Sequence, residues 1–269
     1  MHDNDNLKVA KKRFLIIGCA QGHGQFIATR LMQQGHSLIM LDAKDDIINL
    51  GEEFKKENPN ISAHIFNVLN FSDYDNFLKK VIGSNGIDGV LYFPRFRAEA
   101  DFMKITPEEW QLDIDIGVKG IFFLSRSLIP YLNPKLSSII LYSSLLSSLV
   151  GSESVSYHVS KAGLEQLCRY MAVKFAPINI RVNTIKIGIC LKDGVLNSGV
   201  LKLQPRWEIF KKIQPSGQFS HSEDLSNLTN FLLSDSIANI TGQIFTLDGG
   251  LSIQEHSFMA TSAFLENDK

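Results

Sequence analysis

Short apolar runs alternate with segments of helical periodicity along the first third of the chain. The runs are "RFLIIG", "HSLIMLD", "ISAHIF" and "IDGVLYF", and the segments between them are "QFIATRLMQQG", "DDIINLGEEFKKEN" and "SDYDNFLKKVIG". Runs that are apolar on both faces predict strands buried on both sides, and the apolar spacing of the intervening segments predicts amphipathic helices. Strands that alternate with helices in this way are typical of a parallel sheet.

The same alternation continues towards the end of the chain. Helices are predicted at 107–132, 155–176 and 222–235, and strands at 137–144, 178–188 and 243–250. No repeat, low-complexity segment or linker interrupts the pattern. We therefore expect an α/β protein with a single-domain Rossmann fold at 13–255, in which a doubly wound parallel β-sheet has helices on both faces. A flexible N-terminal arm at 1–12 and a C-terminal tail at 256–269 complete the predicted organisation.

Composition narrows the class of protein. At 269 residues and 44% hydrophobic content, the chain can bury a large core. Its 27 basic and 28 acidic side chains give a net charge of −1, which favours neither nucleic acid nor a membrane surface as a partner. No apolar run approaches the roughly 18 residues of a membrane span, and the polar N-terminus lacks the apolar core of a signal peptide. The cysteines are scattered without metal-ligand spacing, so we expect a reducing, cytoplasmic environment and no bound metal.

A glycine-rich turn, "GCAQGHG", joins the first predicted strand to the first predicted helix and contains Gly18, Gly22 and Gly24. Glycine allows the backbone to turn sharply and to approach a dinucleotide pyrophosphate closely at the N-terminus of a helix. The second strand ends at Asp42, whose carboxylate can accept hydrogen bonds from the adenosine ribose and repel a 2′-phosphate. We therefore expect NAD(H) in preference to NADP(H). Asp42 could instead cap the helix that follows it, and Lys44 could counter its charge.

Tyr157 and Lys161 lie four residues apart in the predicted helix 155–176, so their side chains are neighbours on one helix face. A free tyrosine, with a pKa of about 10, exchanges protons poorly at neutral pH, but an adjacent cation stabilises its phenolate. The pair can therefore act as a general acid or base. The alternative is that both side chains merely cover a solvated face of the helix.

Ser144 lies thirteen residues before Tyr157, at the end of the strand "IILYSS". Ser144, Tyr157 and Lys161 on a Rossmann fold, with the glycine turn, "SYHVSKAGL", "IRVNTIKIG" and "ITGQIFTLDGG", make the chain resemble the short-chain dehydrogenase/reductase superfamily over nearly its whole length. The resemblance implies that the tyrosine exchanges a proton with the substrate oxygen and that the serine hydrogen-bonds the same oxygen. It also implies that the lysine binds the nicotinamide ribose and favours the phenolate of the tyrosine.

The resemblance implies further cofactor contacts and also shows departures. Asn67 stands where an aspartate commonly faces adenine, Val68 follows it, and Gly188 ends the segment that usually reads "PG", with Ile187 in place of the proline. The fourth strand is followed by "YFPR" where "NNAG" is usual. Gly117 stands where relatives carry a catalytic asparagine, and we expect the glycine to leave room for a water that replaces the missing amide.

Basic side chains near the carboxyl edge of the predicted sheet favour an anionic substrate. Arg95 and Arg97 follow the fourth strand, and Lys192 stands where a threonine often meets the nicotinamide in relatives. Guanidinium groups match carboxylates and phosphates well. The alternative is that both arginines are solvated loop residues. The segment 194–214, which usually covers the substrate in this fold, carries no recognisable motif, and His158 is assigned no catalytic role.

The sequence thus predicts an NAD(H)-dependent oxidoreductase that interconverts a secondary alcohol and a ketone. The alternative is a dinucleotide-binding protein with little or no turnover, such as a sensor or an assembly subunit, which the changes at Gly117 and "YFPR" favour. The apolar surface of the helices at 107–132 and 155–176, and the use of the equivalent helices in relatives, predict a homodimer or homotetramer. The expected partners are therefore a small-molecule substrate and further copies of the chain.

Overall fold

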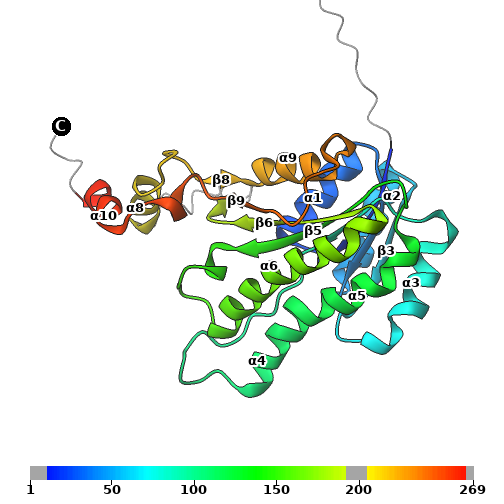
Figure 1. The fold of residues 1–269 in the computed structure, drawn as a ribbon, viewed down its shortest axis with the longest axis horizontal. Helices are drawn as coiled ribbons and strands as arrows, with labels where there is room; N and C mark the ends of the chain where they lie inside the picture. The colour runs from blue at the N-terminus through cyan, green and yellow to red at the C-terminus, as the bar shows by residue number, and fades with distance from the viewer. Residues whose placement is uncertain (1–10, 192–204, 265–269) are drawn as a thin grey trace, which may run out of the picture.

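The computed structural model describes residues 11–191 and 205–264. Its centre is a sheet of seven strands, all parallel, in the order β3-β2-β1-β4-β5-β6-β9 (Figure 1). The strands are β1 (Arg13–Ile17), β2 (Ser37–Asp42), β3 (Ile61–Ile65), β4 (Gly89–Tyr92), β5 (Ser137–Ser144), β6 (Ile180–Ile187) and β9 (Ile244–Leu247). The strand order reverses between β1 and β4. In open α/β sheets, ligands bind in the crevice outside the carboxyl ends of the strands at this reversal.

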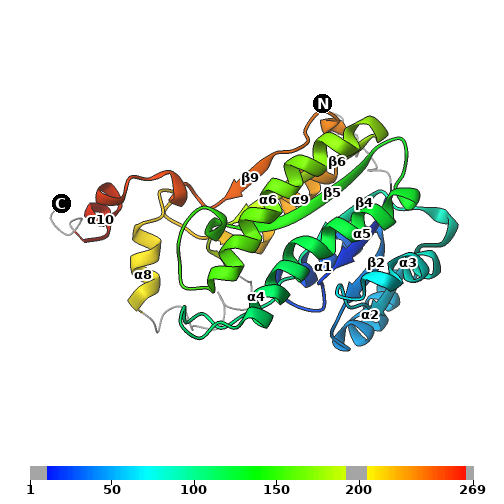
Figure 2. The same cartoon turned by 60° about the horizontal axis from the view of Figure 1, so that its bottom comes forward.

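Helices cover both faces of the sheet (Figure 2). The helices on one face are α1 (Gly22–Gln33), α2 (Asp46–Glu57) and α9 (Ser222–Leu233), and those on the other are α3 (Tyr74–Ile82), α5 (Gly120–Leu128) and α6 (Val155–Phe175). In β1, Phe14 and Ile16 pack in the core under α1, whereas Leu15 and Ile17 pack in the core under α6. Alternate side chains of a strand point to opposite faces, so a strand covered on both sides is apolar throughout. The predicted doubly wound α/β fold is confirmed.

The helix predicted at 107–132 contains an irregular turn. It consists of α4 (Pro107–Ile114), a π-helical turn at Asp115–Lys119, α5, and a short 3₁₀ segment at Ile129–Tyr131. α4 begins at the expected position because Thr106 and Glu109 form a capping box ahead of it. The π-helical turn contains Gly117, the residue predicted to stand at the position of the superfamily's catalytic asparagine. Single π-helical turns inside helices frequently occur at functional sites.

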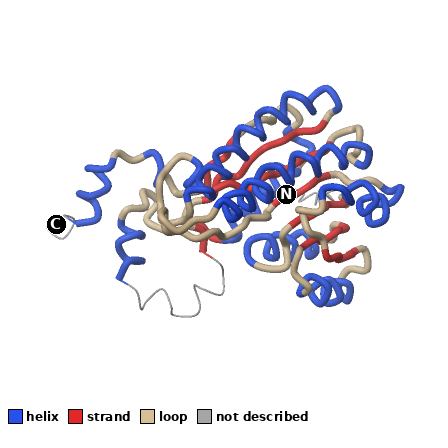
Figure 3. The backbone as a smooth tube through the Cα atoms, turned by 90° about the horizontal axis from the view of Figure 1, so that it is seen from below, coloured by secondary structure: helices blue, strands red, loops and turns tan. Residues whose placement is uncertain are grey.

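The last part of the chain reaches beyond the carboxyl ends of β5, β6 and β9 (Figures 1 and 3). The elements there are α8 (Pro205–Lys212), α10 (His256–Phe264) and a separate pair of short strands, β7 (Cys190–Leu191) and β8 (Ser220–His221). α10 occupies much of the segment that the sequence assigns to a tail. None of the helices in the described ranges has the length and apolar character needed to cross a membrane.

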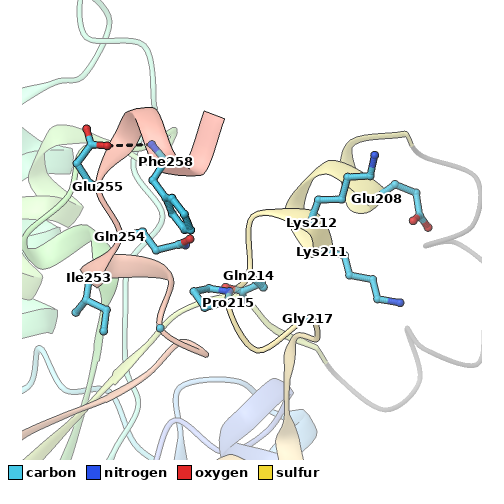
Figure 4. Close-up of a pocket in the computed structure, with 11 residues that line it drawn as sticks. Glu208, Lys211, Lys212, Gln214, Pro215, Gly217, Ile253, Gln254, Glu255 and Phe258 are labelled. Carbon is cyan, nitrogen blue, oxygen red and sulfur yellow. Dashed lines mark hydrogen bonds between the residues drawn. The ribbon is translucent and has the colours of Figure 1, made fainter. Parts of the chain in front are cut away.

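A cavity of about 930 Å³ lies between α8 and the C-terminal segment (Figure 4). Lys211 lines it from α8, and Gln254 and Phe258 line it from the other side. The two sides are joined where Gln254 Nε2 donates a hydrogen bond to the Ile213 carbonyl at 2.7 Å. The end of the segment predicted to cover the substrate therefore forms one wall of a cavity. Residues 194–204 of that segment lie outside the described residues.

Candidate active site

The glycine turn lies at the carboxyl end of β1, beside the reversal of strand order. Gly18 and Gly22 have positive φ values of 82° and 69°, a conformation that residues with side chains rarely adopt. A Cβ atom at Gly24 would lie 2.3 Å from the carbonyl oxygen of Gly18, so α1 packs against the turn because residue 24 has no side chain. α1 has no acidic residue in its first turn, and its N-terminus presents a positive partial charge at the crevice.

Asp42 ends β2 beside this turn. Its carboxylate accepts hydrogen bonds from the backbone N–H of Ala20, at 2.9 Å, and from that of Lys44, at 3.0 Å. The residue at the N-cap of α2 is Asp45. The carboxylate of Asp42 is therefore hydrogen-bonded to the glycine turn. It does not cap α2, so the alternative interpretation, in which Asp42 caps the following helix, does not hold.

The other predicted cofactor contacts also follow strands. Asn67 is exposed after β3 and accepts a hydrogen bond from the Leu69 N–H at 3.0 Å, whereas Val68 is buried. Gly188 follows β6, and a Cβ atom there would lie 2.7 Å from Asp248 Cβ. Because the strands are parallel, these residues lie at the same edge of the sheet as the glycine turn.

Lys161 is buried within α6, with 4% of its surface exposed. Its Nζ donates a hydrogen bond to the carbonyl oxygen of Tyr142 at 2.8 Å and lies 5.6 Å from the centre of the Tyr157 ring. Burial, assisted by the positive charge of Arg95, lowers the pKa of Lys161 to about 8. The ammonium group therefore lies against the tyrosine inside the protein, not on a solvated face of the helix.

Tyr157 and Ser144 are both held by local hydrogen bonds. Tyr157 is in the first turn of α6, and its N–H donates to the hydroxyl of the N-cap residue Ser154 at 3.2 Å. Ser144 ends β5, and its hydroxyl oxygen accepts a hydrogen bond from the Leu146 N–H at 3.3 Å. Because the oxygen of Ser144 is the acceptor in this contact, its proton is available for a further acceptor.

Arg95 reaches the tyrosine from the loop after β4. Its guanidinium carbon lies 5.8 Å from the centre of the Tyr157 ring, and its Nη1 lies 3.8 Å from the Glu153 carboxylate. Arg97 is exposed further along the same loop and is not brought against Tyr157. Lys192 lies outside the described residues. Of the three predicted substrate residues, the structure thus places Arg95 beside the tyrosine.

His158 holds the loop that precedes α6. Its Nδ1 lies 2.7 Å from the Ser154 carbonyl oxygen, and its Nε2 accepts a hydrogen bond from the Gly151 N–H at 3.0 Å. Since a carbonyl oxygen only accepts, these partners assign the proton to Nδ1. Both ring nitrogens are engaged with the backbone, which agrees with a structural role for this histidine.

Comparison with known proteins decides the family. The model of a family described as enoyl-(acyl carrier protein) reductase matches residues 18–252. The chain belongs to this short-chain dehydrogenase/reductase family. It is 26% identical over 253 residues to a 3-oxoacyl-(acyl-carrier-protein) reductase from Thermotoga maritima, an alignment that covers 92% of this chain and 100% of the relative.

Solved structures with the fold of this short-chain dehydrogenase/reductase include two enzymes. A gluconate 5-dehydrogenase from Burkholderia cenocepacia, in complex with NADP and tartrate, has a TM-score of 0.78 and 20% identity, covering 92% of this chain and 98% of that one. A 3-oxoacyl-(acyl-carrier protein) reductase from Brucella melitensis has a TM-score of 0.78 and 21% identity, covering 91% of this chain and 99% of that one. At these identities the likeness establishes the fold.

The region around Gly117 corrects one expectation for this short-chain dehydrogenase/reductase. A Cβ atom at Gly117 would lie 1.9 Å from Ser160 Oγ, and that hydroxyl donates to the Asp113 carbonyl at 3.0 Å. The side-chain position at residue 117 is therefore occupied by the serine, and the expectation that glycine leaves room there for a water is wrong. The π-helical turn brings its backbone so close to α6 that the hydroxyl of α6 fills the space.

Two buried carboxylates near the tyrosine and lysine were not predicted from the sequence. Asp113 is 2% exposed and Glu165 is 6% exposed. A carboxylate oxygen of Glu165 lies 3.1 Å from Nζ of Lys186, so this pair joins α6 to β6. The signal for Glu165 was its position four residues after Lys161, on the same helix face. No comparable spacing marked Asp113, because its partners on α6 lie 41 and 43 positions further along the chain.

Proposed function

We propose that the protein is an NAD(H)-dependent oxidoreductase that interconverts a secondary alcohol and a ketone. The observation that carries this proposal is the contact of the buried Lys161 ammonium with Tyr157 at the carboxyl edge of the sheet. The ammonium places a positive charge beside the tyrosine whose hydroxyl would exchange a proton with the substrate. Family membership supports a dehydrogenase or reductase reaction.

The residues of the crevice fit a dinucleotide. A Cβ atom at Gly24 would lie 2.3 Å from the Gly18 carbonyl oxygen, and Gly18 has a φ of 82°, which residues with side chains rarely adopt. The N-terminus of α1 carries no opposing acid. Gly18, Gly22 and Gly24 would hold the pyrophosphate, Asp42 the adenosine ribose, and Lys161 the nicotinamide ribose. Asn67, Val68 and Gly188 would line the same site.

Tyr157, Ser144 and Lys161 have distinct roles in the proposed reaction. In reduction, Tyr157 gives its proton to the substrate carbonyl oxygen, and in oxidation it takes the proton from the alcohol. Ser144 donates a hydrogen bond to the same oxygen, because its own oxygen is already held by the Leu146 N–H. Lys161 stabilises the phenolate through its charge. The nicotinamide, when bound, supplies or takes the hydride.

Asp42 supports NAD(H) over NADP(H). A carboxylate beside a 2′-phosphate is electrostatically unfavourable, whereas it can accept hydrogen bonds from ribose hydroxyls. The gluconate 5-dehydrogenase of similar fold was solved with NADP, so both cofactors are to be titrated against this chain by protein fluorescence. Equal or tighter binding of NADPH would contradict this part of the proposal.

Arg95 supports an anionic substrate. Its guanidinium lies over the tyrosine ring, and its 3.8 Å contact with Glu153 is long enough to be exchanged for a shorter one with a substrate carboxylate or phosphate. Glu153 would then hold Arg95 near the tyrosine between turnovers. The structurally similar gluconate 5-dehydrogenase was solved in complex with tartrate, which agrees with this substrate class.

The surface of α6 supports self-association into a homodimer or homotetramer. Val159, Tyr170 and Val173 are exposed on this helix, with Val173 72% exposed. Apolar side chains gathered on an outer helix face are typical of a contact between subunits. Light scattering that shows a 30.1 kDa monomer at micromolar concentration would contradict this proposal.

The state of the cysteines supports a cytoplasmic location. Cys19 and Cys168 are free thiols, and both are buried. Burial raises the pKa of the Cys168 thiol to about 11, which keeps it protonated and unreactive. Such thiols suit a reducing compartment. We propose neither a nucleic acid nor a membrane as a partner.

A second candidate function is a dinucleotide-binding protein with little or no turnover. The observation that favours it is the Ser160 hydroxyl in the space beside Gly117, where superfamily members carry the asparagine of the proton relay. A screen of alcohols and ketones with NADH fluorescence as the readout separates the two functions. Turnover of a substrate supports the oxidoreductase, whereas NADH binding without turnover of any carboxylate-bearing or neutral compound supports the second candidate. Binding of neither cofactor would contradict both.

A further inference from the structure

A buried carboxylate joins α4 to the start of α6. Asp113, in the last turn of α4, is 2% exposed. Its Oδ2 accepts hydrogen bonds from the hydroxyls of Ser154, at 3.2 Å, and of Ser156. None of the ion pairs within the described ranges involves Asp113. A buried carboxylate without a paired cation depends on hydrogen bonds and on more distant positive charge for its stability.

The hydrogen bonds of Asp113 lead directly to the backbone of the tyrosine. Ser154 Oγ, which donates to Asp113, accepts in turn from the Tyr157 N–H at 3.2 Å. One turn further along α6, Ser160 Oγ donates to the backbone carbonyl of Asp113 at 3.0 Å. Asp113 therefore binds α6 on both sides of Tyr157, and three serines of one helix converge on a single residue of another.

The position of the Asp113 carboxylate also explains why the fold tolerates its burial. Ser154 is the N-cap of α6, so Asp113 lies at the N-terminus of a helix of 21 residues. Aligned peptide dipoles give such an end a positive partial charge, which stabilises a nearby anion. Asp113 thus acts as an acidic cap supplied by a neighbouring helix.

We propose that Asp113 is a positioning residue of the active site, which fixes the first turns of α6 and holds a negative charge near Lys161. It would stand in for the support that superfamily members obtain from the asparagine at position 117. This inference rests on the proposed function for its catalytic meaning, but its geometric and electrostatic parts can be tested without turnover.

The charge near Lys161 is a balance of groups from several elements. Arg95, from the loop after β4, opposes the ammonium form, whereas Asp113 from α4 and Glu165 from α6 favour it. Glu165 is itself paired with Lys186 of β6, at 3.1 Å, which offsets part of its charge. Asp113 has no paired cation among the described residues, so its neutralisation should lower the pKa of Lys161.

The first experiment measures Lys161 directly. Protein labelled with ¹³C at the lysine Cε is titrated by NMR, and the Lys161 resonance is identified by its absence from Lys161→Arg. In the wild type we expect a midpoint of about 8. In Asp113→Asn, which keeps the shape and an acceptor oxygen, the midpoint should fall by about one pH unit.

The matched control is Asp115→Asn. Asp115 lies two residues further along and is paired with Lys119 at 3.2 Å, so its neutralisation should leave the Lys161 midpoint in place. An unchanged midpoint in Asp113→Asn, or an equal shift in Asp115→Asn, would overturn the electrostatic role. If Asp113→Asn does not fold, Ser156→Ala retains the carboxylate and removes one of its donors.

The second experiment uses a verified substrate. Asp113→Asn should lower kcat about tenfold through misplacement of Tyr157, and should move the alkaline limb of the pH profile to lower pH. Ser156→Ala should lower kcat in the same direction. A lower kcat with an unmoved profile in Asp113→Asn, or an unchanged kcat in Ser156→Ala, would overturn the proposal. A wild type that turns over no substrate would refute the proposed function, while the NMR titration would still decide the placement of Asp113.

Discussion

The two halves of the sheet bury different kinds of side chain. Before β4, the buried polar side chains within the described residues are His36 and Asn58. In the half that contains β5, β6 and α6, the protein buries the charged groups of Lys161, Glu165 and Arg181. The first half places the glycine turn and the strand-end carboxylate of Asp42 at the crevice, whereas the second half buries side chains of opposite charge. We infer that cofactor recognition depends on backbone shape and that the chemistry depends on a balance of buried charges.

Lys161 belongs to the second half of the sheet, and its removal should have the largest effect on turnover. Lys161→Ala should lower turnover by at least about 100-fold, because the phenolate loses its cation, and should also weaken NADH binding. Steady-state kinetics and fluorescence titration measure the two effects. Retention of full turnover would show that the charge of Lys161 is not part of the chemistry.

An asparagine at position 117, which the resemblance to the superfamily leads one to expect there, should lower the free energy of unfolding of this protein. In Gly117→Asn the new Cβ would collide with Ser160 Oγ, which is only 1.9 Å from its position, at a cost of about 2 kcal/mol in the free energy of unfolding. Urea denaturation measures this cost. Ser160→Ala combined with Gly117→Asn should recover part of it, and equal stability of the single and double variants would contradict the steric explanation.

Neutralisation of Asp42 should change cofactor recognition, the property assigned to the first half of the sheet, and not the chemistry assigned to the second half. Asp42→Asn should change the ratio of the NADH and NADPH dissociation constants by about tenfold in favour of NADPH, since a like-charge repulsion is removed. Asp45→Asn, at the N-cap of α2, is the control and should leave the ratio unchanged. A change in kcat larger than the change in cofactor preference would contradict the separation of the two halves.

The smallest expected effect concerns substrate charge. Arg95→Ala should raise KM roughly fivefold for a carboxylate-bearing substrate and little for a neutral analogue. Arg97→Ala is the matched control from the same loop, and its effect should be smaller because Arg97 is not placed against Tyr157. Equal effects of the two substitutions would assign both arginines to general surface charge.

The fold was predictable because a local sequence pattern marks each of its main strands and helices. Runs such as "RFLIIG" and the helical spacing between them identify buried strands and the helices that cover them. The interruption of the helix at 107–132 was not predictable in the same way. It depends on how closely the backbone at Gly117 approaches Ser160, a contact between distant parts of the chain.

The residues of the candidate site also differ in whether local sequence spacing could predict them. Residues within one motif, such as Gly18, Gly24 and the pair Tyr157 and Lys161, could be found from spacing alone. Asp113 could not be, because its partners lie on α6, 41 and 43 positions away in the chain. Arg95 and Arg97 are indistinguishable in sequence, and the fold alone selects the one that reaches the tyrosine.

Substitution of Tyr157 shows whether its hydroxyl transfers the proton in the proposed reaction. Tyr157→Phe removes one hydroxyl and keeps the ring against which Lys161 packs, and Tyr170→Phe provides a control on an exposed tyrosine of the same helix. With a substrate from the screen, Tyr157→Phe should abolish turnover and leave the NADH dissociation constant nearly unchanged, while Tyr170→Phe should retain turnover. Wild-type turnover in Tyr157→Phe would show that this hydroxyl does not transfer the proton and would contradict the proposed mechanism.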